Sequence, residues 1–155
     1  MGIMIIDDCP DNRLLLRHIL RAAGYQQLLL AESALDAFEQ INSWGEALQL
    51  RAIFLDILMP GMDGIEACAR IRQVKRLEQV PVIMVSAKNG SSDKAAAFAA
   101  GATHYISKPI DRQEIMSCVR ELLPGVTASA IAPAYIGHID LRKLLDKIQQ
   151  HVTLH

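Results

Sequence analysis

The chain has 155 residues, of which 51% are hydrophobic and 21% charged, and its formal net charge is -1. This length allows one ordinary domain with a buried core and a short additional segment, and the composition is typical of globular rather than disordered proteins. The near balance of acidic and basic residues excludes a broad basic field for nucleic acid and a polybasic patch for a membrane surface.

Nothing in the sequence predicts a membrane span, a secretory signal or a disulfide framework. No run approaches the roughly 18 to 20 consecutive apolar residues that cross a bilayer, and the start of the chain has no basic region before its two aspartates. The three cysteines, Cys9, Cys68 and Cys118, are widely spaced and form no metal-binding pattern. We interpret them as small buried hydrophobes in a reducing compartment, and we expect a cytoplasmic location.

Five short apolar runs alternate with longer amphipathic stretches. The runs span residues 3–6, 28–31, 52–55, 82–86 and 105–106. Each run is continuous rather than alternating, as in parallel strands that are buried on both faces. Because right-handed crossovers place the intervening helices on both faces of a sheet, this order predicts an α/β fold with a five-stranded, doubly wound parallel sheet.

The intervening stretches have the spacing and end signals of helices. The first, from about residue 11 to residue 23, places Leu15, Ile19 and Ala22 on one stripe, and Gly24 marks its end. The later helices are expected to begin at Ser33, after Gly64, after a cap formed by residues 91–93, and after Asp111.

The pattern changes after residue 123. Pro124 and Gly125 end the fifth helix, residues 126–133 resemble a linker, and residues 140–152 have helical spacing. We therefore predict a domain over residues 2–123 and a linker with a C-terminal helix over residues 124–155. This tail could form a homodimer contact, begin an output domain, or pack back on the first domain, and its apolar seam is too short to indicate a coiled coil.

Polar residues fall at the ends of four predicted strands. Asp7 and Asp8 follow the first strand, Asp56 follows the third, Ser86 ends the fourth, and Lys108 follows the fifth. In a parallel sheet with the first, third and fourth strands adjacent, these positions converge outside the carboxyl ends of the strands. Crowded carboxylates are costly unless a cation is bound, and hard oxygen ligands suit Mg²⁺. The set therefore predicts phosphoryl transfer to Asp56, with Lys108 and Ser86 contacting the phosphoryl oxygens.

Four segments resemble the receiver domains of bacterial response regulators. They are Ile5-Ile6-Asp7-Asp8, residues 54–64 with Asp56 followed by Ile57-Leu58-Met59-Pro60-Gly61, Val85-Ser86-Ala87, and Tyr105-Ile106-Ser107-Lys108-Pro109. The resemblance covers about residues 2–123. It implies a flavodoxin-like (βα)5 receiver fold in a two-component system, with a histidine kinase or histidine phosphotransfer protein as donor and a downstream output domain or target protein as receiver of the signal.

The resemblance also implies a role for each site residue. Asp56 would be the phospho-acceptor, and Asp8, Asp56 and the Leu58 main-chain carbonyl would bind Mg²⁺, with Asp7 acting mainly through water. Ser86 and Tyr105 would form the switch, which reports on the surface of the fourth helix, fifth strand and fifth helix. The peptide before Pro109 is expected to be cis.

Two other functions are weaker. An aspartate-nucleophile phosphatase of the haloacid-dehalogenase type would carry a second acid two residues after the first, where this chain has Leu58. The chain is therefore not expected to be an enzyme beyond self-directed phosphotransfer and dephosphorylation. A phosphorylation-independent adaptor on the same fold would not need the full set of site residues.

Overall fold

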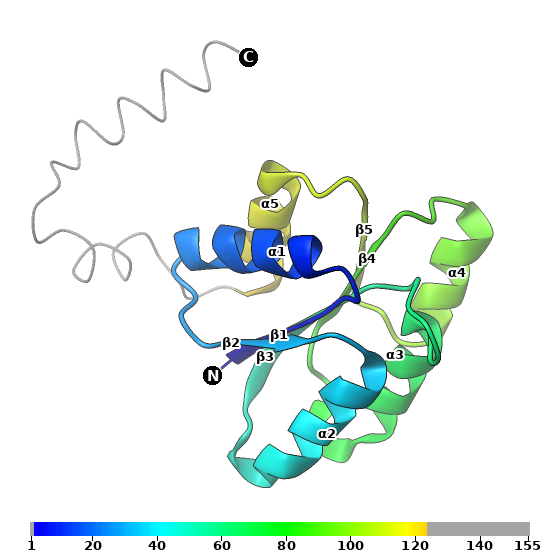
Figure 1. Cartoon of the computed structure of the whole chain (residues 1–155). Helices are drawn as coiled ribbons and strands as arrows, with labels where there is room; N and C mark the ends of the chain where they lie inside the picture. Colours follow the sequence, from blue (N-terminus) through cyan, green and yellow to red (C-terminus); the bar gives the residue numbers. More distant parts are fainter. Residues whose placement is uncertain (1, 124–155) are drawn as a thin grey trace, which may run out of the picture. The chain divides into compact units, whose positions relative to one another are not determined.

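Five parallel strands form one sheet in the order β2-β1-β3-β4-β5 in the computed structural model, which describes residues 2–123 (Figure 1). The strands are β1 Gly2–Ile6, β2 Leu28–Ala31, β3 Leu50–Leu55, β4 Val82–Ser86 and β5 His104–Ser107. The helices are α1 Pro10–Ala22, α2 Ala34–Trp44, α3 Gly64–Gln73, α4 Ser91–Ala99 and α5 Arg112–Leu122, with 3-10 turns η1 Gly45–Ala47 and η2 Lys75–Leu77. The predicted fold class is confirmed. The predicted linker and helix over residues 124–155 lie outside the described residues.

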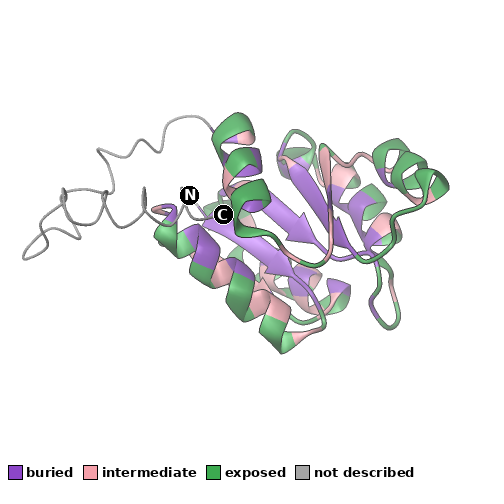
Figure 2. Ribbon diagram, turned by 90° about the horizontal axis from the view of Figure 1, so that it is seen from above, coloured by how far each residue is buried: buried purple, intermediate pink, exposed green. Residues whose placement is uncertain are grey.

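The helices cover both faces of the sheet. Helices α1 and α5 lie together on one face, and α2, α3 and α4 lie on the other (Figure 1). The strands of the sheet are mostly buried (Figure 2), and β1 and β4, which flank the central strand β3, are buried along their whole length. This burial explains their continuous apolar sequence, because both faces of each strand contact helices. Among the helices of residues 2–123, none has the length and apolar character that a membrane crossing requires.

The predicted apolar stripe of α1 is confirmed at Ile19 and wrong at its other two positions. Leu15 is 43% exposed and Ala22 is exposed, whereas Leu16 and Leu20 are buried beside Ile19. Leu14, Leu15 and Leu16 are consecutive leucines, so the sequence pattern did not show which of them would face the sheet. Gly24 has a positive φ of 100° just after the helix, as its position as a stop signal predicts.

Side-chain caps begin three of the helices. Ser33 accepts a hydrogen bond from the Asp36 amide at 3.0 Å, and Asp63 and Asp111 cap α3 and α5 in the same way. The prediction for α4 was wrong: Gly90 is its N-cap residue and supplies no side chain, while Ser91 already belongs to the helix. The first turn of α4 therefore lacks a side-chain cap.

Gly64 allows α3 to begin directly against the strand end that carries Asp56. A Cβ atom at Gly64 would lie 2.1 Å from the Asp56 carbonyl oxygen and 2.7 Å from the Ile57 Cα. Both neighbours are backbone atoms, so neither can rotate away. The Gly64 amide also donates a 2.9 Å hydrogen bond to the Ile57 carbonyl. The start of α3 is thus fixed to the backbone of the site.

We expect Gly64→Ala to lower the free energy of unfolding by ~2 kcal/mol or more, because the added methyl group overlaps backbone atoms. Urea denaturation of the full chain measures the change. Gly90→Ala is the control, since its Cβ would meet only the ends of the Asp93 and Ser92 side chains, which can rotate. Equal stability of the two variants would contradict the close approach at Gly64.

Candidate functional site

Three carboxylates gather at the carboxyl edge of the sheet. Asp7 and Asp8 follow β1, and Asp56 follows β3; one oxygen from each lies within 4.8 Å of the others. Strands β1 and β3 are paired with Ile6 opposite Leu55, so the residues after them are neighbours. Asp7 and Asp56 are buried, and Asp8 is exposed. The cluster therefore opens to solvent on the side of Asp8.

Lys108 joins the two buried carboxylates. Its ammonium lies 3.0 Å from Asp7 Oδ2 and 3.1 Å from Asp56 Oδ2. The Lys108 amide donates to the Ser86 carbonyl at 2.8 Å, which fixes the base of this side chain on β4. The Lys108–Pro109 peptide is cis, as expected from the sequence. The predicted convergence of Asp7, Asp8, Asp56 and Lys108 is thus observed.

Burial and neighbouring charges act together on the pKa values of Asp56 and Lys108. Burial raises the pKa of Asp56, and repulsion from Asp7 raises it further, while the hydrogen bond and charge of Lys108 act in the opposite direction. Burial alone would lower the pKa of Lys108, but the hydrogen bonds to Asp7 and Asp56 and the charges of these two carboxylates together outweigh that effect and raise it. Lys108 is therefore a permanent cation at neutral pH, shared between two carboxylates.

The three carboxylates fit a hard divalent cation. One lysine neutralises only part of their charge, and carboxylate oxygens with an open, solvent-facing side are the environment that Mg²⁺ accepts. The surrounding backbone supports this arrangement, since the amide of Cys9 donates to Asp7 Oδ1 at 2.9 Å and the amide of Leu58 donates to Asp56 Oδ1 at 3.2 Å. These bonds orient the carboxylates through their Oδ1 atoms, whereas Lys108 contacts their Oδ2 atoms.

Ser86 and Tyr105 meet at the loop between β4 and α4. Ser86 is buried, and its Oγ accepts a 3.2 Å hydrogen bond from the Lys88 amide. The Tyr105 hydroxyl donates to the Lys88 carbonyl. Burial raises the pKa of Tyr105, and a hydrogen bond with Ser86 opposes this shift. The two residues that the sequence paired as a switch therefore contact the same loop.

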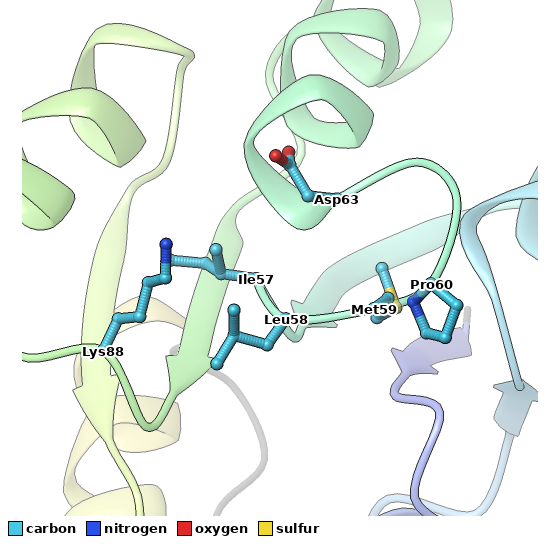
Figure 3. A pocket seen from close by; sticks show the side chains of 6 residues that line it. All are labelled: Ile57, Leu58, Met59, Pro60, Asp63 and Lys88. Carbon is cyan, nitrogen blue, oxygen red and sulfur yellow. The ribbon is translucent and has the colours of Figure 1, made fainter.

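A shallow hollow of about 300 Å³ lies beside the acidic cluster. Figure 3 shows Leu58 between Lys88, on the β4–α4 loop, and the Met59-Pro60 segment that leads to Asp63. Leu58 is 47% exposed, and the Lys88 ammonium leans toward Asp93 at 3.9 Å. A bulky apolar side chain and a long cation thus line a hollow whose first lining residue, Ile57, directly follows Asp56.

Sequence reasoning missed one cation near the cluster. Arg13, in the second turn of α1, donates a 2.6 Å hydrogen bond from Nη1 to the Asp7 carbonyl. This bond ties the loop that carries Asp7 and Asp8 to the helix that follows it. The acceptor is a main-chain carbonyl, which no side-chain motif reveals.

The comparisons with known proteins identify the family. The model of the response regulator receiver domain matches residues 3–120, and the chain belongs to that family. PilG of Pseudomonas aeruginosa is 30% identical over 127 residues, which cover 82% of this chain and 90% of PilG. A putative response regulator from Chloroflexus aurantiacus has a TM-score of 0.71 at 34% identity, covering 78% of this chain and 95% of that one.

A third comparison includes a ligand and a partner. The CheX–CheY–BeF3–Mg²⁺ complex from Borrelia burgdorferi matches with a TM-score of 0.71 at 26% identity, covering 78% of this chain and 87% of that chain. The sequence resemblance to receiver domains is therefore confirmed by family, relatives and fold together.

The raised pKa of Asp56 gives a prediction for stability against pH. A carboxyl group whose pKa is higher in the fold than in the unfolded chain contributes stability at low pH, and this contribution is lost as the pH rises through the folded value. In buffer containing a chelator, we expect Asp56→Asn to raise the free energy of unfolding at pH 7. The gain should shrink toward pH 3.8, the ordinary value for this group. Urea denaturation across this range tests it, with exposed Asp63→Asn as the control; an Asp56→Asn variant less stable at pH 7 than the unaltered chain would contradict it.

Proposed function

We propose that this receiver domain accepts a phosphoryl group on Asp56 from the phosphohistidine of a histidine kinase or phosphotransfer protein, in a reaction that needs Mg²⁺. The observation that carries the proposal is the geometry of Lys108, whose ammonium lies 3.0 Å and 3.1 Å from the two buried carboxylates. A cation held there can stabilise the charge of a phosphoryl group in transit, which is the main task in this chemistry.

Each site residue has a defined task in the transfer. An Asp56 oxygen attacks phosphorus, an acyl phosphate bond forms, and the bond from phosphorus to the donor nitrogen breaks, leaving the electron pair on the imidazole. Lys108 and the Ser86 hydroxyl would contact the phosphoryl oxygens. Asp7, Asp8 and Asp56 would hold the ion, together with the Leu58 carbonyl, and bound Mg²⁺ would supply further neutralisation of these oxygens. The Borrelia relative crystallised with BeF3 and Mg²⁺ supports this assignment.

The signal would leave through the surface formed by α4, β5 and α5. Lys94, Phe98 and Arg112 are exposed on this surface, and Tyr105 connects it to the loop at Ser86. A new charge at Asp56 would bias this arrangement and so change the affinity for a downstream partner. The Borrelia complex, which includes CheX, shows that a related protein binds another protein. The cytoplasmic location expected from the sequence stays a prediction.

We also propose that the chain does not turn over an external substrate. Leu58 stands where an aspartate-nucleophile phosphatase would carry its second acid, and its side chain offers no proton. Phosphotransfer to Asp56 and hydrolysis of the resulting acyl phosphate would be the whole chemistry.

The direct test is phosphorylation of the full chain with Mg²⁺ and acetyl phosphate, followed by intact-mass measurement. We expect one phosphoryl group per chain, none after chelation and none in Asp56→Asn, because the acceptor carboxylate is then absent. Asp63→Asn is the matched control: Asp63 is an exposed helix cap in the same loop, and Asn caps a helix equally well. Uptake by Asp56→Asn would overturn the proposal; no uptake by the unaltered chain would favour the adaptor, and phosphate release from a phosphomonoester would favour the phosphatase.

The hollow beside Asp56 predicts a long-lived acyl phosphate. We expect the phosphorylated chain to persist for minutes rather than seconds, because Leu58 and Lys88 restrict the approach of water. Leu58→Ala and Lys88→Ala should each accelerate the decay several-fold, since a tenfold change requires only about 1.4 kcal/mol of barrier. Loss of the phosphoryl mass over time measures the rate, and Leu35→Ala, at a 66% exposed position on α2, is the control. Decay within seconds in the unaltered chain would contradict the prediction.

A further inference from the structure

One arginine binds a group of main-chain carbonyls far from the acidic cluster. Arg72, in the last turn of α3, donates from Nε and Nη2 to the Gly101 carbonyl at 2.9 Å and 2.7 Å. Its Nη1 donates to the carbonyls of Leu77, Glu78 and Val80 at 3.0, 3.2 and 2.6 Å. The planar guanidinium thus joins the end of α3, the segment before β4 and the turn after α4.

The turn after α4 is built around this arginine. Gly101 has φ of +110°, and a Cβ atom there would lie 2.7 Å from Arg72 Cγ. Its amide donates to the Phe98 carbonyl and the Ala102 amide to the Ala97 carbonyl, which closes the C-terminal end of the helix. Thr103 continues the connection, because its Oγ1 accepts from the Val82 amide at 3.1 Å and its amide donates to the Val82 carbonyl at 2.8 Å. The C-terminal end of α4 is therefore held to both α3 and β4.

The N-terminal end of α4 has much weaker attachments. Gly90 provides no side-chain cap, and the Lys88–Asp93 pair is long, at 3.9 Å, with both side chains partly exposed. The Lys94 ammonium lies 5.6 Å from the centre of the Tyr105 ring, a contact that is weak at an exposed site. The two ends of the same helix therefore differ sharply in how they are fixed.

Helix α3 connects the fixed end of α4 to the acceptor. Its first residue, Gly64, packs on the Asp56 backbone, and its last turn supplies Arg72. The backbone beside Asp56, helix α3 and the Arg72 guanidinium thus form a continuous connection from Asp56 to Gly101. This connection does not include Ser86 or Tyr105.

We propose that Arg72 is a positioning residue for the switch: it fixes the C-terminal end of α4, so that phosphorylation moves the β4–α4 loop and the first turn of α4 about a pivot at Gly101. This inference rests on the proposed function, since it concerns the response to a group on Asp56. Arg72 contacts neither the phosphoryl group nor the metal, and it acts through the carbonyls that it holds.

Site-resolved amide hydrogen exchange on the full chain tests the pivot, with Mg²⁺ and beryllofluoride as the mimic of the phosphoryl group. In the unaltered chain we expect beryllofluoride to change exchange at residues 88–94 and to leave Gly101, Ala102 and Thr103 unchanged. In Arg72→Gln and Arg72→Lys, the beryllofluoride-dependent change should extend into residues 99–103 and reach ~10-fold there, because several hydrogen bonds to a charged group are lost. Arg70→Gln is the control: Arg70 lies on the same helix but makes only an exposed pair with Glu66 at 2.9 Å.

The difference between exchange with and without beryllofluoride separates positioning from stability. A merely structural Arg72 would raise exchange equally in both states, leave this difference unchanged in the variants, and overturn the proposal. A response in the unaltered chain that is as large at 101–103 as at 88–94 would also overturn it. No response anywhere, with Asp56 unable to bind beryllofluoride and Mg²⁺, would instead count against the proposed function.

Discussion

The repulsion among three carboxylates at one edge of the sheet is the constraint on which the site depends. Asp7, Asp8 and Asp56 place oxygens within 4.8 Å of one another, and a single lysine partly offsets their charge. Burial and, second to it, the charge of Asp7 raise the pKa of Asp56, so that the ionised carboxylate opposes folding. The crowding persists because the strands that carry these residues are fixed by burial on both faces. The apolar sheet thus positions the three carboxylates where a divalent cation and a phosphoryl group could bind.

The order of the strands brings residues that lie about a hundred positions apart in the sequence into one site. Because β1 lies beside β3, β3 beside β4 and β4 beside β5, the residues after these strands share one edge of the sheet. Lys108 extends this arrangement by one strand: its amide is held by the Ser86 carbonyl, and its side chain returns to Asp7 and Asp56. The long side chain of Lys108, which follows the edge strand β5, spans the distance between β5 and β1.

Features of the fold that depend on side-chain type and spacing could be predicted from the sequence. Contacts between side chains and main-chain carbonyls could not. Continuous apolar runs located all five strands, and the acids at their ends located the cluster. The buried face of α1 was wrong because three adjacent leucines were equivalent until packing against the sheet selected Leu16. Arg13 and Arg72 were missed because both bind carbonyl oxygens, which every residue carries and which only the folded backbone places in reach.

The contrast between side-chain contacts and main-chain contacts also explains how a charge added at Asp56 could affect one end of α4 more than the other. A phosphoryl group on Asp56 would compete for Lys108, which already contacts two carboxylates, and would compete for the Ser86 hydroxyl, which accepts a hydrogen bond from Lys88. The change at Ser86 would act on the loop before α4, because its Oγ accepts a hydrogen bond from the Lys88 amide and residues 87–90 are exposed. The far end of α4 is held through main-chain carbonyls by a guanidinium whose charge does not titrate. We therefore expect motion at the weakly attached N-terminal end of α4 rather than at its C-terminal end.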